Sequence, residues 1–140
     1  MNRSVYSLQP DVAEKALAFF AELTEQGILF FTLETLRTKE IQEAYYAQGR
    51  RRLGDVNLLR RKAGLWDIGE AENSRKITWT MNSRHLSGRA LDIAPRTEDY
   101  KILWGAPFEE WEKIGVIGES HGFEWGGRWE ELDLPHFEMA

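Results

Sequence analysis

The chain contains no cysteine, and this constrains both its fold and its chemistry. No disulfide can staple the fold, so its 140 residues must be held together by a buried apolar core, which one domain of this length can form. Thiolate zinc sites and cysteine nucleophiles are excluded. Any metal ion must be bound by aspartate, glutamate or one of only three histidines.

Neither a membrane segment nor a secretory signal can be found. No apolar run approaches the roughly 18 residues of a membrane span, and the first residues lack an apolar signal core. We therefore expect synthesis in the cytoplasm. The net charge of −5 argues against a nucleic-acid partner. We read the basic residues at 50–52 and 60–62 as a solvated surface rather than a nucleic-acid-binding patch.

Apolar periodicity predicts helices separated by short strands. Helices are expected over residues 10–26, 38–48 and 108–121, with a shorter one near 55–63. Strands are expected over residues 29–36, 77–80, 90–94, 123–125 and 135–139. Because no regular βαβ rhythm is present, we expect an α+β fold with a small antiparallel sheet flanked by helices. We assign no role to the long polar segment over residues 50–76.

One segment places a histidine and an aspartate in unusual settings. His85 comes just before a glycine turn at Gly88, and Asp92 lies within an apolar strand. A carboxylate in such a strand is costly unless it is paired with a cation or bound to a metal ion. This segment alone leaves both an arginine salt bridge and a metal site open.

The C-terminal segment favours the metal site. Asp133 and His136 are three residues apart, so a bend can bring both to one place. His85, Asp92 and His136 would form a set of two histidines and one carboxylate, which is typical of a catalytic zinc site with one open position. Zinc lowers the pKa of bound water to about 7. Asp133, close to a ligand yet separate from it, is the candidate general base.

The remaining histidine and the tryptophans have simpler interpretations. His121 ends a predicted helix just before Gly122, where a cation is favourable to the helix dipole, so we assign it a structural role. Most of the six tryptophans should be core residues. Four of them, at positions 104, 111, 125 and 129, predict an aromatic-walled groove in the C-terminal half.

Three motifs occur in order along the chain and include the candidate metal ligands. They are Ser83-x-His85-x-x-Gly88-x-Ala90-x-Asp92 with Asp133-x-x-His136, Glu34-Thr35-Leu36-Arg37-Thr38-x-Glu40 with Tyr46-Ala47-Gln48-Gly49-Arg50, and Gly122-Phe123-Glu124-Trp125-Gly126-Gly127-x-Trp129. The likeness to known proteins that they carry spans about residues 8–139. Together the motifs resemble the zinc D-alanyl-D-alanine carboxypeptidase and dipeptidase family. The resemblance is strongest to its branch of L-alanyl-D-glutamate endopeptidases, found as phage endolysins and bacterial wall hydrolases. The sequence departs from that branch at Ile41, where glutamine is common, and at Arg128, where an acidic residue is common.

The resemblance implies a metal centre and a catalytic base. It implies a hedgehog/DD-peptidase-like fold with one Zn²⁺ per chain, bound by His85, Asp92 and His136. Asp133 would then be the general base and acid. It also implies that Arg37 polarises the scissile carbonyl and stabilises the oxyanion, for which a permanently charged fork of donors is suited.

Three site assignments are less direct. Without the family, Arg37 would be read as a salt-bridge partner of Glu40 at the end of a strand. The resemblance implies that Ser83 helps to hold the substrate backbone. Trp125 is expected to line the substrate groove.

The implied activity is hydrolysis of peptidoglycan stem peptides between L-alanine and D-glutamate. Two alternatives stay open: a D,D-carboxypeptidase acting on D-Ala-D-Ala, and a non-catalytic zinc-containing module that binds the wall. We expect a monomer with one peptidase domain over residues 1–140 and no separate wall-binding module. An endolysin without a signal needs a partner such as a holin to reach the peptidoglycan on which it acts.

Overall fold

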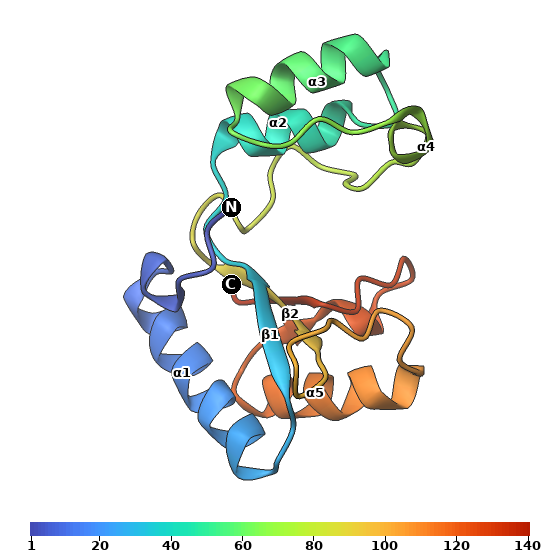
Figure 1. The fold of residues 1–140 in the computed structure, drawn as a ribbon. Coiled ribbons are helices and arrows are strands. Elements are labelled where there is room, and N and C mark those ends of the chain that lie inside the picture. The colour runs from blue at the N-terminus through green and yellow to red at the C-terminus, as the bar shows by residue number, and fades with distance from the viewer. The chain divides into compact units, whose positions relative to one another are not determined.

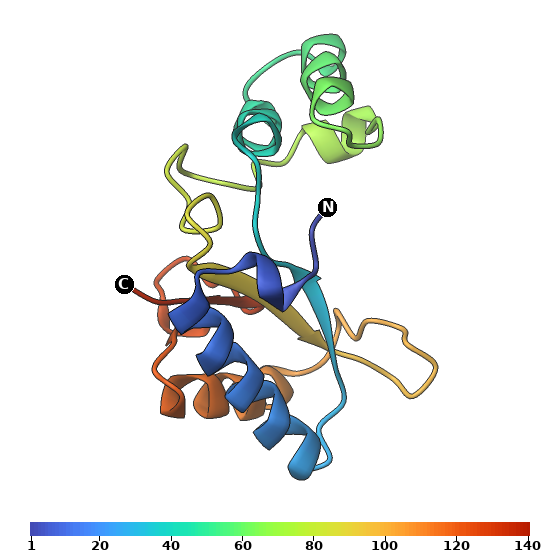
Figure 2. The ribbon, with the colours of Figure 1, turned by 90° about the vertical axis from the view of Figure 1, so that its left-hand side faces the viewer.

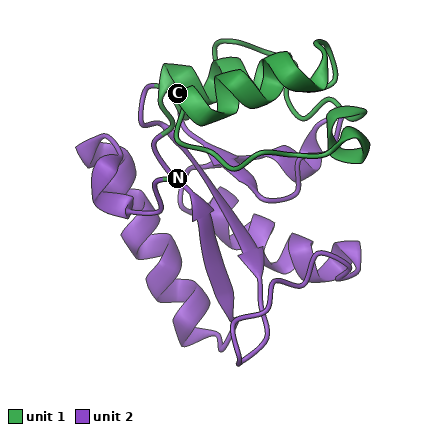
Figure 3. Cartoon of the chain, turned by 45° about the horizontal axis from the view of Figure 1, so that its top comes forward, with its two compact units in different colours: residues 1, 37–86 green, residues 2–36, 87–140 purple.

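The computed structural model describes residues 1–140, which divide into two compact units (Figure 3). The larger unit comprises residues 2–36 and 87–140, and the smaller unit comprises Met1 and residues 37–86. None of the helices has the length and apolar character needed to cross a membrane.

The larger unit holds the whole β-sheet. Its elements are η1 (Val5–Ser7), α1 (Pro10–Glu25), β1 (Phe30–Glu34), β2 (Ala90–Pro95), α5 (Phe108–Ser120), β3 (Glu124–Trp125), η2 (Gly126–Arg128) and β4 (His136–Glu138). The strand order is β1-β2-β4-β3, and every neighbouring pair is antiparallel. Strands β1 and β2 lie side by side (Figure 1). This is the α+β arrangement with a small antiparallel sheet that the sequence predicts.

Helices α1 and α5 pack together against one face of this sheet (Figure 2). Alternation along the strands sends Leu91, Ile93 and Phe137 to that face, where all three are almost fully buried. The helices supply most of the remaining core residues, which include Val12, Ala16, Phe19, Leu23, Trp111, Ile114 and Ile117. Because alternate residues point the opposite way, Asp92 and His136 lie on the face away from these helices.

Local signals set the ends of the helices. Pro10 occupies the first turn of α1, where its missing N–H costs nothing, and Gly27 follows the helix with a φ of 74°. Helix α5 ends at Ser120, one residue before the predicted end, with His121 at its C-cap.

The smaller unit is helical, with α2 (Lys39–Ala47), α3 (Leu53–Lys62) and α4 (Glu70–Asn73). The Thr38 hydroxyl caps α2 by accepting a hydrogen bond from the Ile41 amide at 3.2 Å. Gly49 ends the helical run with a φ of 78°, and a Cβ there would lie only 2.7 Å from the backbone nitrogen of Lys76. A glycine is therefore required both for the turn and for this close approach.

The strand predicted over residues 77–80 is wrong, because this segment forms no regular strand. Its backbone carbonyls are bound by side chains instead of by a neighbouring strand. Arg50 donates from Nη1 to the Thr78 carbonyl at 3.0 Å, and Gln42 donates from Nε2 to the Thr80 carbonyl at 2.6 Å. These bonds hold the segment in place without a β-ladder.

Candidate metal centre

Two neighbouring strands bring Asp92 and His136 together. The residues are cross-strand partners in the β2–β4 register, so their side chains share one face of the sheet. The distance from His136 Nδ1 to Asp92 Oδ1 is 3.2 Å. Two donor atoms at about 2.0–2.1 Å from a tetrahedral zinc ion are separated by roughly 3.3 Å. The pair is therefore spaced as two ligands of one ion would be.

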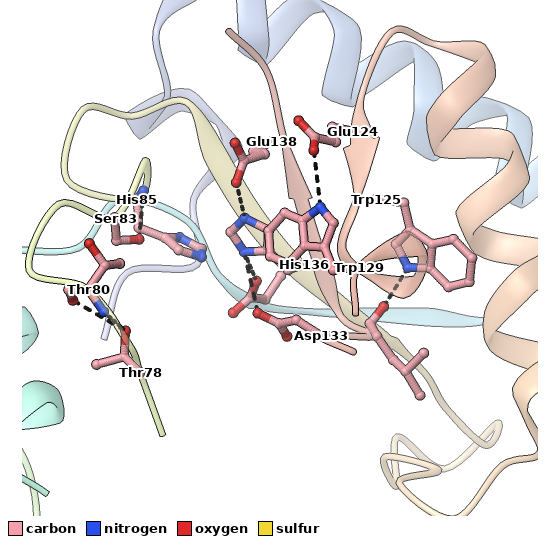
Figure 4. A network of polar contacts seen from close by, with 12 residues as sticks. Thr78, Thr80, Ser83, His85, Glu124, Trp125, Trp129, Asp133, His136 and Glu138 are labelled. Atoms are coloured by element: carbon pink, nitrogen blue, oxygen red, sulfur yellow. Dashed lines mark hydrogen bonds and ion pairs between the residues drawn. The ribbon is translucent and has the colours of Figure 1, made fainter. Parts of the chain in front are cut away.

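A turn places Asp133 beside the same histidine. The His136 amide donates to the Asp133 carbonyl at 3.1 Å, and Asp133 Oδ2 lies 3.9 Å from His136 Nδ1 (Figure 4). The Asp133 side chain is 49% exposed, whereas the His136 side chain is only 8% exposed. The second carboxylate thus lies close to the ligand pair but open to solvent.

The glycine motif before this turn has a packing function. The Asp133 amide donates to the Gly126 carbonyl at 3.0 Å. A Cβ on Gly126 would lie 2.3 Å from the Asp133 carbonyl oxygen, and a Cβ on Gly127 would meet the Trp125 ring at 2.2 Å. Both glycines let the chain fold tightly around Asp133.

The His136 ring is held on its other side as well. Its Nε2 lies 2.9 Å from Glu138 Oε1, and its ring lies 5.2 Å from that of Trp129 (Figure 4). Burial lowers the pKa of His136, but hydrogen bonds with Asp92 and Glu138 outweigh this effect and raise the pKa to about 9. The metal-free ring is therefore a cation between carboxylates, and a metal ion would take the place of its Nδ1 proton.

His85 belongs to the smaller unit and is fixed by local backbone contacts. It is 1% exposed, and its amide donates to Ser83 Oγ at 3.2 Å. Its carbonyl accepts from the Arg37 amide at 3.0 Å. Ser83 and Arg37, both predicted site residues, are thus adjacent to His85.

The Arg37 guanidinium is buried and oriented by other residues of its unit. Nη1 donates to Gln42 Oε1 at 2.7 Å, and the guanidinium carbon lies 4.9 Å from the centre of the Tyr45 ring. Gln42 is fully buried, and its amide group also bonds to the Thr80 carbonyl. Gln42 was not predicted as a site residue, although a glutamine on the apolar side of a predicted helix was a usable signal.

The three predicted metal ligands form a group that could hold a metal ion. One ligand atom each from His85, Asp92 and His136 lies within 4.8 Å of the other two. Two imidazole nitrogens and one carboxylate oxygen are a donor set that suits zinc, and three protein ligands leave one position open. The residues present therefore fit the metal that the sequence motifs imply.

The third histidine is not part of this group. His121 lies at the C-cap of α5, and its Nε2 is 2.8 Å from Glu22 Oε1 of α1. This position agrees with the structural role expected for it, because the pair ties the ends of two core helices.

The tryptophans do not form the expected groove. Trp125 is 0% exposed, and its Nε1 donates to the Leu134 carbonyl at 2.7 Å. A side chain buried in this way offers no surface to a substrate, so the role expected for Trp125 is corrected to core packing beneath the Asp133–His136 turn. Trp111 is also a core residue, whereas Trp104 is 61% exposed.

The departure at Arg128 is explained by local pairing. Its guanidinium bonds to Glu112 at 2.7 Å and to Glu119 at 3.1–3.2 Å, and it lies 4.9 Å from the centre of the Trp125 ring. Both acidic partners belong to α5. Arg128 thus ties the glycine motif to that helix.

Comparisons with known proteins find peptidases among the relatives of this chain. A family model described as D-alanyl-D-alanine carboxypeptidase matches residues 76–139. The chain is 30% identical over 140 residues to the peptidoglycan L-alanyl-D-glutamate endopeptidase CwlK of Bacillus subtilis, with 94% of this chain and 73% of that protein covered. It is also 30% identical over 115 residues to the L-alanyl-D-glutamate peptidase of Listeria phage A118, covering 81% of this chain and 31% of that protein.

Solved structures confirm the fold. The L-Ala D-Glu endopeptidase ChiX of Serratia marcescens matches with a TM-score of 0.62 at 20% identity, over 97% of this chain and 83% of that one. A Zn(II) complex of the D,D-pentapeptidase VanY matches with a TM-score of 0.57 at 14% identity, over 94% and 72% of the two chains. The relative CwlK, which is 30% identical and covered over 73% of its length, shows that the chain belongs to the peptidase M15 family, the family of the D-alanyl-D-alanine carboxypeptidases.

Proposed function

We propose that this protein is a zinc-dependent peptidoglycan peptidase that hydrolyses the L-alanyl-D-glutamate bond of stem peptides. The observation that carries the proposal is the pair of carboxylates beside one imidazole nitrogen. Asp92 lies at 3.2 Å from His136 Nδ1 and Asp133 at 3.9 Å. We assign Asp92 as a metal ligand and Asp133 to proton transfer.

His85, Asp92 and His136 would hold the zinc ion. When bound, zinc supplies a Lewis acid for the scissile carbonyl and lowers the pKa of water to about 7. Asp133 takes a proton from the attacking water as the new carbon–oxygen bond forms. It then gives that proton to the amide nitrogen as the carbon–nitrogen bond breaks, which leaves a carboxylate and a free amine.

Arg37 is assigned to the carbonyl oxygen. Its permanent positive charge and planar donors suit the negative charge that develops there in the transition state. Gln42 and Tyr45 hold the guanidinium in place, so little reorganisation is needed as the reaction proceeds. For Ser83 we propose a hydrogen bond to the substrate backbone.

The bond that is cleaved is assigned from the relatives. Two relatives at 30% identity carry L-alanyl-D-glutamate peptidase in their names, and one of them is covered over 73% of its length. The family model is described as a carboxypeptidase, so removal of a terminal D-alanine is the second candidate. Both activities would use the same zinc ligands and the same base.

One experiment separates the candidates. Purified protein is incubated with muropeptides carrying pentapeptide stems, and the products are identified by mass spectrometry. Our proposal expects products cut between L-alanine and D-glutamate. Loss of one terminal D-alanine would support the carboxypeptidase instead, and binding to peptidoglycan without any product would support a non-catalytic module.

The metal requirement is tested on the same substrate. A chelator should abolish product formation, and one equivalent of Zn²⁺ per chain should restore it. Circular dichroism before and after chelation shows whether the fold persists. Full turnover by protein that contains no metal would defeat the proposal.

A further inference from the structure

Glu138 contacts the candidate ligand His136 on the side away from Asp92. The two residues are two positions apart on β4 and therefore share a face of the sheet. Glu138 Oε1 lies 2.9 Å from His136 Nε2, whereas Asp92 Oδ1 lies 3.2 Å from Nδ1 (Figure 4). The two ring nitrogens thus have different carboxylate neighbours.

These two contacts are not equivalent for a metal site. A carboxylate accepts hydrogen bonds and does not donate them, so Glu138 can hold the remaining ring proton on Nε2 once a metal ion takes the place of the Nδ1 proton. The lone pair on Nδ1 is then directed to the metal ion that Asp92 also binds. A neutral imidazole without such an acceptor is free to carry its proton on either nitrogen, and a ring protonated at Nδ1 offers no lone pair toward Asp92.

Burial protects the bond between Glu138 and His136 from competition by water. The Glu138 side chain is only 14% exposed and the His136 side chain 8% exposed, so water competes weakly for the bond between them. The Trp129 ring, 5.2 Å from the imidazole, further limits its rotation.

We propose that Glu138 is a positioning residue of the metal centre: by accepting from Nε2–H of His136, it directs Nδ1 toward the zinc ion. Bonds of this kind from metal-binding histidines to carboxylates orient the ring and increase its basicity, and their loss costs about 10- to 100-fold in metal affinity. The inference rests on the proposed function, because it takes His136 as a zinc ligand.

Three variants separate orientation from charge. Glu138→Ala removes the acceptor and the charge, whereas Glu138→Gln removes the charge but keeps an acceptor oxygen. Glu124→Gln is the matched control. Glu124 is the cross-strand partner of Glu138 on β3, and its carboxylate accepts from Trp129 Nε1 at 3.0 Å instead of from the imidazole.

Zinc affinity is measured for each protein by competition with a chromophoric chelator, using Zn²⁺ alone as the probe. We expect Glu138→Ala to bind zinc about 10- to 100-fold more weakly than the parent protein. Glu138→Gln and Glu124→Gln should stay within about threefold of the parent. Melting of the metal-free proteins, followed by circular dichroism, checks that each variant is folded.

A second readout reports on the ring itself. Nitrogen-15 NMR of the zinc-loaded parent should show His136 protonated at Nε2 and coordinated through Nδ1. Coordination through Nε2 would overturn the inference. So would a zinc affinity of Glu138→Ala equal to that of the parent, or an equal loss in Glu138→Ala and Glu138→Gln. Failure of the parent protein to bind zinc would refute the proposed metal centre as well.

Discussion

Replacing Asp133 with asparagine tests whether Asp133 transfers the proton while Asp92 binds the metal ion. Asparagine has nearly the same shape as aspartate but cannot accept a proton at neutral pH. The side chain is 49% exposed, and the contacts of the turn with His136 and Gly126 run through the Asp133 backbone, so the substitution leaves them in place. We therefore expect the free energy of unfolding to change by less than about 0.5 kcal/mol.

The expected loss of activity is large. Asp133 is assigned both the proton taken from water and the proton given to the leaving amine. General acid–base catalysis contributes about 10²- to 10⁴-fold to rate, which corresponds to about 2.7–5.5 kcal/mol of transition-state stabilisation. We expect kcat for muropeptide hydrolysis to fall by at least about 100-fold. Zinc content should stay at one ion per chain, because Asp133 is not among the three proposed ligands.

The assay follows product formation by mass spectrometry and zinc content by elemental analysis on the same sample. Glu131→Gln is the control, since it removes one exposed carboxylate from the same loop. Turnover of Asp133→Asn within about threefold of the parent would refute the assignment of the base. Loss of zinc together with activity would instead make Asp133 a fourth ligand and leave the proton transfer unexplained.

Three further predictions concern stability and packing. In the metal-free protein, the raised pKa of His136, about 9, stabilises the fold fully below the unfolded-state pKa of about 6.5. This contribution is lost as the pH rises through 9, so the melting temperature should fall over that window, and His136→Gln should flatten the fall; a parallel decline in both proteins would contradict it. Gly126→Ala forces the Asp133 carbonyl to move, because the new Cβ would lie 2.3 Å from it, and should lower kcat at least about tenfold. Gly105→Ala, where a Cβ meets nothing within 4 Å, should be silent, and equal kcat values for the two variants would refute the packing argument. Trp125→Ala should cost about 3–5 kcal/mol in urea unfolding, whereas Trp79→Ala, at a site that is 62% exposed, should cost less than about 1 kcal/mol; similar costs would show that Trp125 is not a core residue.

Patterns that depend on near neighbours predicted most of the helices and strands. Helix α1 follows from its apolar repeat and from Gly27, and α2 begins at the residue after Thr38, as its capping signal indicates. The segment over residues 77–80 could not be predicted in this way. Its apolar and β-branched residues resemble a strand, but Gln42 and Arg50 bind its carbonyls from more than 25 positions away. Nothing local in the sequence distinguishes such bonds from a ladder.

In the candidate site, too, some residues could be predicted from the sequence and others could not. The spacing of the motifs identified three side chains whose ligand atoms lie within 4.8 Å of one another. Glu138 and Gln42, which contact His136 and Arg37, belong to no motif that could be recognised in the sequence. A polar residue that only orients another site residue does not stand at a fixed sequence spacing that would reveal its role. Trp125 was misassigned because an aromatic residue in a family motif fits a groove and a core equally well until its burial is known.

The alternation of β2 and β4 links the core to the site. In each strand, one residue of the hydrophobic core lies directly beside a candidate ligand: Leu91 precedes Asp92, and Phe137 follows His136. A shift of one residue in the register would put a charged side chain into the core and a leucine or phenylalanine at the metal centre. The burial of Leu91 and Phe137 against α1 and α5 therefore selects the register that pairs Asp92 with His136. The two short strands can thus hold these two ligands in register, because the hydrophobic core, and not the metal ion alone, opposes any slip between them.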